Sequence, residues 1–325
     1  MKKFLIILIF IISFLCIPYY NNDYIDITHM INVSSVGLEK NNNTFLVYAY
    51  VIDNYTMSKS DFNTSSTSTP STIISSSGNT IEQAFFNLYD SVFVNLNFSH
   101  IETLVLQNNF ISNNNINELI NFISTHNDFF PKFNIFITEE NIKDVFNIKY
   151  FSDTSSYYNI LTEYKSEIEH HPTTFIDLVN DFLEPNYFIL YPSLKLNDNI
   201  IKSEKKGNSL FIDGYYYYDT GMLYKMNFSN YPLLYLLYST NDISFEINNQ
   251  QYFLYGYSLK TFRLKNKLFI LFYSKSNYKY SLKKIVLENI INLYNKNVDV
   301  YNLKYFNIDL NNIRIISVEK KVYKY

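Results

Sequence analysis

Residues 80–107 constrain the fold of this chain more strongly than any other segment. Thr80 and Gln83 have the spacing of a capping box at the start of a helix. The apolar residues that follow recur at the spacing of one helix face: Ile81, Ala84, Phe85, Leu88 and Val92. After a polar break, the continuous apolar run at residues 104–106 indicates a strand that is buried on both faces. The segment therefore predicts a helix, a loop and a core strand in that order.

A second amphipathic helix and several shorter elements are predicted around this unit. Asn115 is its expected N-cap and Glu118 its third residue, and its apolar face consists of Ile116, Leu119, Ile120 and Ile123. Pro172 and Asp177 mark the start of a later helix. The elements expected in the first half are strands at 31–37, 44–52 and 133–137 and helices at 139–146, 159–168 and 173–182. The Ser/Thr-rich run at 58–77 lacks apolar anchors and is expected to be an exposed, mobile loop.

The second half of the chain has a different pattern. Apolar runs at 209–218, 222–228, 243–247, 251–262 and 267–274 predict an antiparallel sheet, followed by a helix at 281–295 and a strand at 313–322. The polar, basic stretch at 195–208 places the expected domain boundary between regions 17–195 and 196–325. The predicted fold class is α+β, with mixed or antiparallel sheets and flanking helices in two to three small subdomains.

The N-terminus has the pattern of an export segment, assigned here to residues 1–16. Lys2 and Lys3 precede an apolar run at 4–17, which is shorter than a membrane-spanning helix. Cys16 is the sole cysteine and lies at the end of this run, although Leu15 makes a poor lipobox. Three alternatives remain open: a lipidated Cys16, an uncleaved apolar anchor, and a plain signal peptide with a chance cysteine. Each of them places the body of the protein outside the cytoplasm.

Composition narrows the class of partner. The apolar content of 47% is enough to fill sizeable cores in a chain of 325 residues, which by length fits about two domains. The net charge of −3 gives no basic field, and this argues against binding to nucleic acid.

The polar candidates for chemistry do not form a catalytic or metal-binding pattern. His100 lies at a strand entry without a motif for a partner acid, so its ring is expected to be buried and to tie the loop to the backbone. The pair at 170–171 lacks the frame of a metal site and fits surface residues before a helix, and the pair at 139–140 fits the first turn of a helix. The four tyrosines at 215–218 fit a core strand better than an aromatic ligand platform. We therefore expect no catalytic residue, no metal and no cofactor.

Several segments, taken in order, resemble the Ger(x)C family, the C-subunit lipoproteins of bacterial spore germinant receptors. The pattern at 78–88 resembles the family's Gly-x-Thr entry to its first helix, and 98–106 resembles its Phe-Ser-His loop and strand. Similar correspondences occur at 29–39, 210–215 and 297–303, although the C-terminal region looks shorter than in the family. The resemblance assigns structural roles to Gly37, Gly78, Thr80, His100, Gly214 and Asp299. At the glycines, a turn needs positive φ or the backbone approaches closely.

The resemblance also implies a function and partners. It describes a non-enzymatic lipoprotein that acts in spore germination, held by lipid on Cys16 at the outer face of the spore's inner membrane. There it would assemble with two integral-membrane receptor subunits, of the A and B types. The alternative from another class is an exported solute-binding lipoprotein for sugars or peptides. A secreted hydrolase is a third hypothesis, and no group of residues in the sequence supports it.

Overall fold

The computed structural model of the chain describes most of the sequence after residue 29. The described residues are 30–52, 71–148, 173–184, 187–202, 205–219, 221–227, 234, 241–247, 250–273 and 279–318. The chain divides into two units, residues 1–30 and residues 31–325, and the elements below belong to the second unit, with β1 beginning at the boundary residue Met30. The expected helix at 159–168, the histidines at 170–171 and Cys16 lie outside the described residues.

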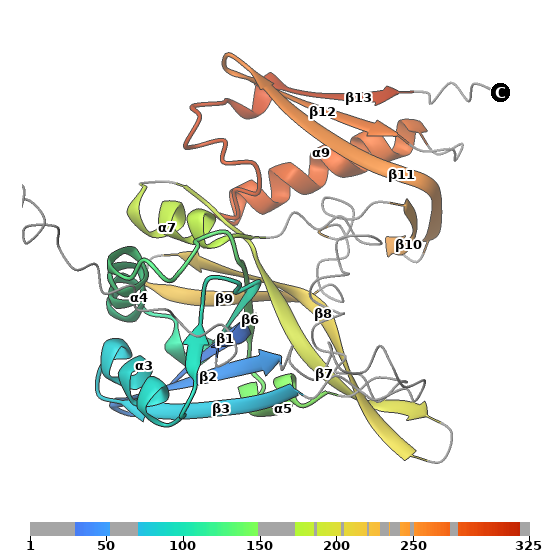
Figure 1. Ribbon diagram of the computed structural model, residues 1–325. Coiled ribbons are helices and arrows are strands. Elements are labelled where there is room, and N and C mark those ends of the chain that lie inside the picture. The colour runs from blue at the N-terminus through green and yellow to red at the C-terminus, as the bar shows by residue number, and fades with distance from the viewer. Residues whose placement is uncertain are drawn as a thin grey trace, which may run out of the picture. The chain divides into compact units, whose positions relative to one another are not determined.

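The first part of the second unit is a large mixed sheet (Figure 1). The described residues form nine strands in the order β3-β2-β1-β5-β6-β7-β8-β9, and β4 pairs with β1 off this path. The strands are β1 (Met30–Asn41), β2 (Thr44–Ile52), β3 (Ser71–Gly78), β4 (Asn95–Asn97), β5 (Thr103–Gln107), β6 (Asn134–Thr138), β7 (Tyr191–Lys202), β8 (Lys205–Asp219) and β9 (Met222–Asn227). Strands β1, β5, β6 and β7 run parallel to one another, and the outer pairs are antiparallel.

Helices cover both faces of the central strands. They are α3 (Ile81–Asp90), α4 (Asn113–Thr125), α5 (Ile142–Phe146) and α7 (Phe175–Leu183), with a short 3-10 helix, η2 (Asn108–Phe110). In β5, Leu104 and Leu106 join the core cluster that contains the buried faces of α3, α4 and α7. Val105 belongs to a second cluster, with Ile142 and Phe146 of α5. Successive residues of a strand point to opposite faces, so the apolar run in β5 is explained by burial on both sides.

The helix starts follow the predicted capping chemistry, with one shift. The Thr80 hydroxyl accepts from the amide of Gln83 at 3.1 Å, while the side chain of Gln83 accepts from the amide of Asn79. At α7 a full capping box forms between Thr174 and Asp177. Helix α4 begins one turn earlier than expected, because Ser112 is its N-cap instead of Asn115. A side-chain oxygen of Ser112 therefore satisfies a free amide of the first turn.

Part of the Ser/Thr-rich run is a strand, which corrects the prediction of a loop over 58–77. Residues 53–70 lie outside the described residues, but Ser71–Gly78 forms β3 and pairs with β2 over its full length. Ile73 and Ile74 of β3 pack against the two core clusters on opposite faces of the sheet. Two apolar residues and a complete ladder of backbone hydrogen bonds are enough to hold this serine-rich segment in place.

The C-terminal part contains a four-stranded sheet with one long helix. Its elements are β10 (Asn241–Ile247), β11 (Gln250–Leu264), β12 (Lys267–Tyr273), α9 (Lys279–Asn295), a 3-10 helix η3 (Leu310–Asn312) and β13 (Ile313–Val318). Strands β10, β11 and β12 are antiparallel, and β13 returns parallel to β12 after α9. The combination of mixed sheets and flanking helices confirms the predicted α+β class.

Strands β8 and β9 belong to the large sheet and not to a separate C-terminal sheet. The expected boundary between 195 and 196 falls inside β7, whose partner β8 pairs with it from Tyr191 to Lys202. On their other side, Tyr215 and Met226 join the core cluster of the C-terminal part, together with Phe188 and Leu190. The β7–β9 segment therefore contributes to the two core clusters of the large sheet and to the core cluster of the C-terminal part.

Two glycines predicted from the resemblance lie where the backbone approaches a neighbour closely. A β-carbon at Gly37 in β1 would overlap Cγ2 of Ile142 in α5, and one at Gly214 in β8 would overlap the carbonyl of Met226 in β9. Gly78 is similarly tight against the backbone of α3. All three have ordinary φ, and among the described glycines only Gly221 has a positive φ. Close approach, and not a turn, therefore explains them.

The contact between β1 and α5 generates a first prediction. Gly37→Ala should lower the free energy of unfolding by about 1–3 kcal/mol, because the added methyl group overpacks the core against Ile142. Chemical denaturation of the single variant measures this loss. In the double variant Gly37→Ala/Ile142→Ala the obstructing methyl group is gone, so the two costs should be clearly less than additive. Full additivity would show that the two residues do not touch.

Candidate functional site

The residues singled out from the sequence do not gather at one site. Gly37, Gly78 and Thr80 serve the packing and capping of the large sheet and its first helix. Gly214 lets the backbone of β8 pack closely against β9, and Asp299 lies in the loop after α9. Cys16 is outside the described residues. Each described residue of this set supports a different local structure, and this pattern fits structural roles better than a shared chemical site.

His100 is exposed, which corrects the expectation of a buried ring tied to the backbone. The loop before β5 is ordered by other groups. The side-chain oxygen of Asn97 accepts from both the amide and the hydroxyl of Ser99, and Phe98 is fully buried against the ring of Phe85. Because Asn97 and Phe98 hold the loop, the imidazole of His100 is not needed for its order and faces solvent.

Asp299 orders the loop after α9. It is 4% exposed, and its two carboxylate oxygens accept from the amides of Leu303 at 2.8 Å and Lys304 at 2.7 Å. In the same loop, the side-chain oxygen of Asn302 accepts from the amide of Phe188, ahead of β7. A carboxylate with two backbone donors stabilises a turn, so Asp299 holds the loop in shape while Asn302 connects it to the segment that enters the large sheet.

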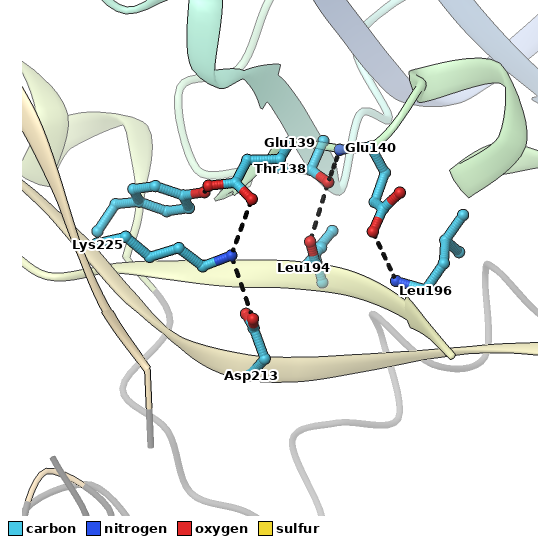
Figure 2. A network of polar contacts seen from close by, with 8 residues as sticks. Thr138, Glu139, Glu140, Leu194, Leu196, Asp213 and Lys225 are labelled. Atoms are coloured by element: carbon cyan, nitrogen blue, oxygen red, sulfur yellow. Dashed lines mark hydrogen bonds and ion pairs between the residues drawn. The ribbon is translucent and has the colours of Figure 1, made fainter. Parts of the chain in front are cut away.

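A polar cluster lies at the carboxyl end of β6 (Figure 2). The ammonium of Lys225 in β9 lies 3.1 Å from Asp213 in β8 and 3.4 Å from Glu139, which follows β6. The hydroxyl of Tyr216 donates to the other oxygen of Glu139 at 2.7 Å. Burial raises the pKa of Tyr216, and the neighbouring Glu139 carboxylate raises it further. We call Glu139, Asp213, Tyr216 and Lys225 the polar junction.

Neighbouring backbone contacts extend the polar junction toward β7. The Thr138 hydroxyl donates to the carbonyl of Leu194 at 2.9 Å and accepts from the amide of Glu140 at 3.0 Å (Figure 2). The Glu140 carboxylate in turn accepts from the amide of Leu196. Helix α5 begins only at Ile142 with Asn141 as its N-cap, so the expectation of a first-turn pair at 139–140 is wrong. The carboxylates of Glu139 and Glu140 therefore contact residues of β7, β8 and β9. No local sequence pattern predicts these tertiary contacts.

A second feature is a cavity of about 690 Å³ beside α7. Its walls come from the end of α7, the turn between β8 and β9, and the loop after α9. Its charged lining residues are Asp181, Glu184, Asp219, Asp299 and Lys304. At its wall, Asp181 accepts a hydrogen bond from the hydroxyl of the buried Tyr191 at 2.6 Å. Burial raises the pKa of Asp181 from 3.8 to about 7, although hydrogen bonds from Tyr191 and from Ile189 lower it.

Neither the cavity nor the polar junction has the geometry of a catalytic centre. Over the described ranges, no group of three or more His, Cys, Asp or Glu side chains is arranged to hold a metal ion. Asp181 is paired with a tyrosine whose own pKa is raised well above 10 by burial, so this hydroxyl is a hydrogen-bond donor and not a nucleophile. The carboxylates of the polar junction are occupied by Lys225 and Tyr216. Both clusters connect strands and loops.

The described helices also include none that could cross a membrane: none combines the length and the apolar content that a span requires.

Comparison with known proteins decides the family. A model described as the spore germination protein N-terminal domain matches residues 23–196, more than half of the chain. The chain belongs to this spore germination family. The family model ends inside β7, so the germination domain includes the parallel strands and both groups of helices on them. The resemblance to the Ger(x)C family is thereby confirmed.

A solved structure, the crystal structure of the GerBC protein, is similar to this germination protein. The two share 11% sequence identity, with 87% of this chain and 95% of that chain covered at a TM-score of 0.37. No curated protein matches the sequence.

The polar junction generates a second prediction. Lys225→Met should lower the free energy of unfolding by about 2–3 kcal/mol, because it leaves the largely buried carboxylate of Asp213 without its counter-ion. The loss should be largely recovered in Lys225→Met/Asp213→Asn, where no buried charge remains. Thermal and chemical denaturation measure both, with Lys143→Met at an exposed position of α5 as the matched control. An equal loss in the single and double variants would contradict the ion pair.

The raised pKa of Asp181 predicts a pH dependence of stability. Between about pH 4 and 7 the folded state holds a proton that the unfolded state has released, so the free energy of unfolding falls as pH rises through this window. The fall is on the order of 3–4 kcal/mol. In Asp181→Asn this component should disappear, while Tyr191 keeps an acceptor. Denaturation at several pH values measures it, with Glu184→Gln on the same cavity as control. An unchanged profile in Asp181→Asn would refute the assignment.

Proposed function

We propose that this chain is the C-type lipoprotein subunit of a spore nutrient germinant receptor, and that it acts without catalysis. The single observation that carries the proposal is the match of residues 23–196 to the spore germination protein N-terminal domain. The described side chains are consistent with it, since their buried polar groups serve hydrogen bonds and ion pairs between strands and loops. Such groups favour a scaffold that presents surfaces to partners.

Membrane attachment is assigned to the N-terminal segment. Lys2 and Lys3, the apolar run at 4–17 and Cys16 supply the sequence features of an exported lipoprotein. A single acyl chain holds a protein only marginally at a bilayer, whereas a diacylated cysteine provides two signals for stable anchoring. Lipid on Cys16 would thus keep the chain at the outer face of the spore's inner membrane.

The partners in this proposal are the two integral-membrane subunits of the receptor. Integral-membrane subunits would sense the nutrient, and the present chain would stabilise or position them. The described part of this chain does not supply the arrangement of acid, base and nucleophile that an enzymatic role would need.

A genetic and biochemical experiment tests the proposal. Spores that lack this chain should germinate poorly in response to nutrient, and the wild-type gene should restore the response. Cys16→Ala should abolish labelling by a fatty-acid analogue and release the protein from the membrane fraction, because the site of acylation is lost. Optical density of the spore suspension and immunoblots of the fractions are the measurements.

The outcomes separate the alternatives. If the wild-type protein is unlabelled but remains in the membrane fraction, an uncleaved apolar segment and not a lipid holds it at the membrane. Normal germination without the gene would contradict the receptor role. Two neighbouring genes for multi-spanning membrane proteins would fit a receptor, whereas a neighbouring pair of permease genes would support the solute-binding alternative.

A further inference from the structure

The two faces of the C-terminal sheet differ in what covers them. Figure 1 shows α9 along one face of β11, β12 and β13. On this inner face Leu268, Ile270 and Ile313 are buried in one cluster with Val286 and Ile290 of α9. Because successive residues of a strand point to opposite faces, the intervening residues of these strands lie on the outer face. We call the latter surface the outer sheet face.

The outer sheet face carries exposed apolar side chains. Phe262 and Phe269 are opposite each other in the register of β11 and β12, and their rings stack with centroids 4.8 Å apart. Leu264 lies at the end of β11 and is 60% exposed, while Phe262 is 45% exposed. Ile316 of β13, opposite Leu271, is 40% exposed. These residues form a continuous apolar patch over three strands.

Cations surround this patch, and its strands carry no carboxylate. Lys260, Lys267 and Arg314 occupy outer positions of β11, β12 and β13, and Lys265 lies in the turn between β11 and β12, all exposed. The sequences of these three strands contain no Asp or Glu. Asp309 precedes β13, and its carboxylate accepts from the amide of Asn311 at 2.9 Å. In a chain of net charge −3, this is a basic surface.

We propose that the outer sheet face binds an anionic lipid surface. Exposed Leu and Phe side chains flanked by Lys and Arg are the composition that inserts shallowly into a bilayer interface and attracts acidic headgroups. A protein partner fits the composition less well, since lysine is depleted in protein–protein interfaces. Over the described residues no ion pair involves Lys260, Lys265 or Lys267, so their charges are available to headgroups.

The inference deepens the proposed function and rests on the membrane attachment proposed there. Residues 16–30 span at most about 50 Å even when fully extended, so an anchor at Cys16 keeps the body of the protein near the bilayer. A second, weaker contact then acts at high effective concentration and fixes orientation as well as proximity. The protein would then be held at the membrane by two contacts, the N-terminal anchor and the outer sheet face.

Site-specific fluorescence on the full chain tests this inference. Cys16 is the sole cysteine, so Cys16→Ser/Leu264→Cys accepts one environment-sensitive probe at the outer sheet face. Vesicles are in excess and contain brominated acyl chains, which quench a probe that enters the bilayer. We expect quenching with equal parts phosphatidylcholine and phosphatidylglycerol and none with phosphatidylcholine alone. Added Lys260→Gln and Lys267→Gln should raise the lipid concentration needed roughly 30-fold, at about fivefold per lysine.

A probe at Phe130→Cys, another exposed position in the same Cys16→Ser background, is the matched control and should stay unquenched. Circular dichroism confirms that each variant is folded. A probe at position 264 that stays unquenched with the mixed vesicles overturns the inference, as does quenching that appears only after the two membrane subunits are added. Flotation of the wild-type chain, which retains Cys16, beside the Cys16→Ser chain reports separately on the N-terminal anchor, so failure of the anchor is distinguishable from failure at the sheet.

Discussion

The fold depends on central parallel strands that must be covered on both sides. Leu104 and Leu106 of β5 face α3 and α4, and Val105 between them faces α5. Parallel strands of this kind occur where helices shield both faces. The chain supplies α4 in the connection from β5 to β6, α5 and α7 in the connection from β6 to β7, and α3 directly after β3. The close contact between Gly37 and Ile142 follows from the same constraint, since α5 must approach β1 closely to cover this face of the sheet.

Polar groups then attach the later strands to this core. Lys225 and Tyr216 reach Glu139 across the sheet, and Thr138 and Glu140 hold the backbone of β7. Farther along, Asp299 shapes the loop after α9, where Asn302 binds the amide of Phe188. Except for those of Asp299, these contacts connect segments far apart in sequence, so Lys225, Glu139 and Glu140 contribute to the relative placement of strands.

Sequence reasoning succeeded where the signal was local and failed where it was long-range. The helix face after Thr80, the strand at 104–106 and the start of α7 could be predicted, because periodicity and capping act within a few residues. Strand β3 was missed since its partner β2 supplies the order that a serine-rich segment lacks. The roles of residues 139–140 depend on contacts with β7 to β9, which are distant in sequence. The exposure of His100 depends on how Asn97 orders the loop, and no rule of residue spacing reveals this.

The long pairing of β7 with β8 has a consequence for how the protein is divided. The germination domain ends at residue 196 by its family model, yet that residue lies in the middle of an antiparallel ladder that extends to Lys202. A fragment that ends there would leave β7 as an exposed edge strand, whose unpaired amides and carbonyls could pair with a strand of another molecule. It would also lose Lys225 and Tyr216, the two side chains that contact Glu139. The smallest piece that keeps β7 and β8 paired on both sides therefore extends through β9, past Met226.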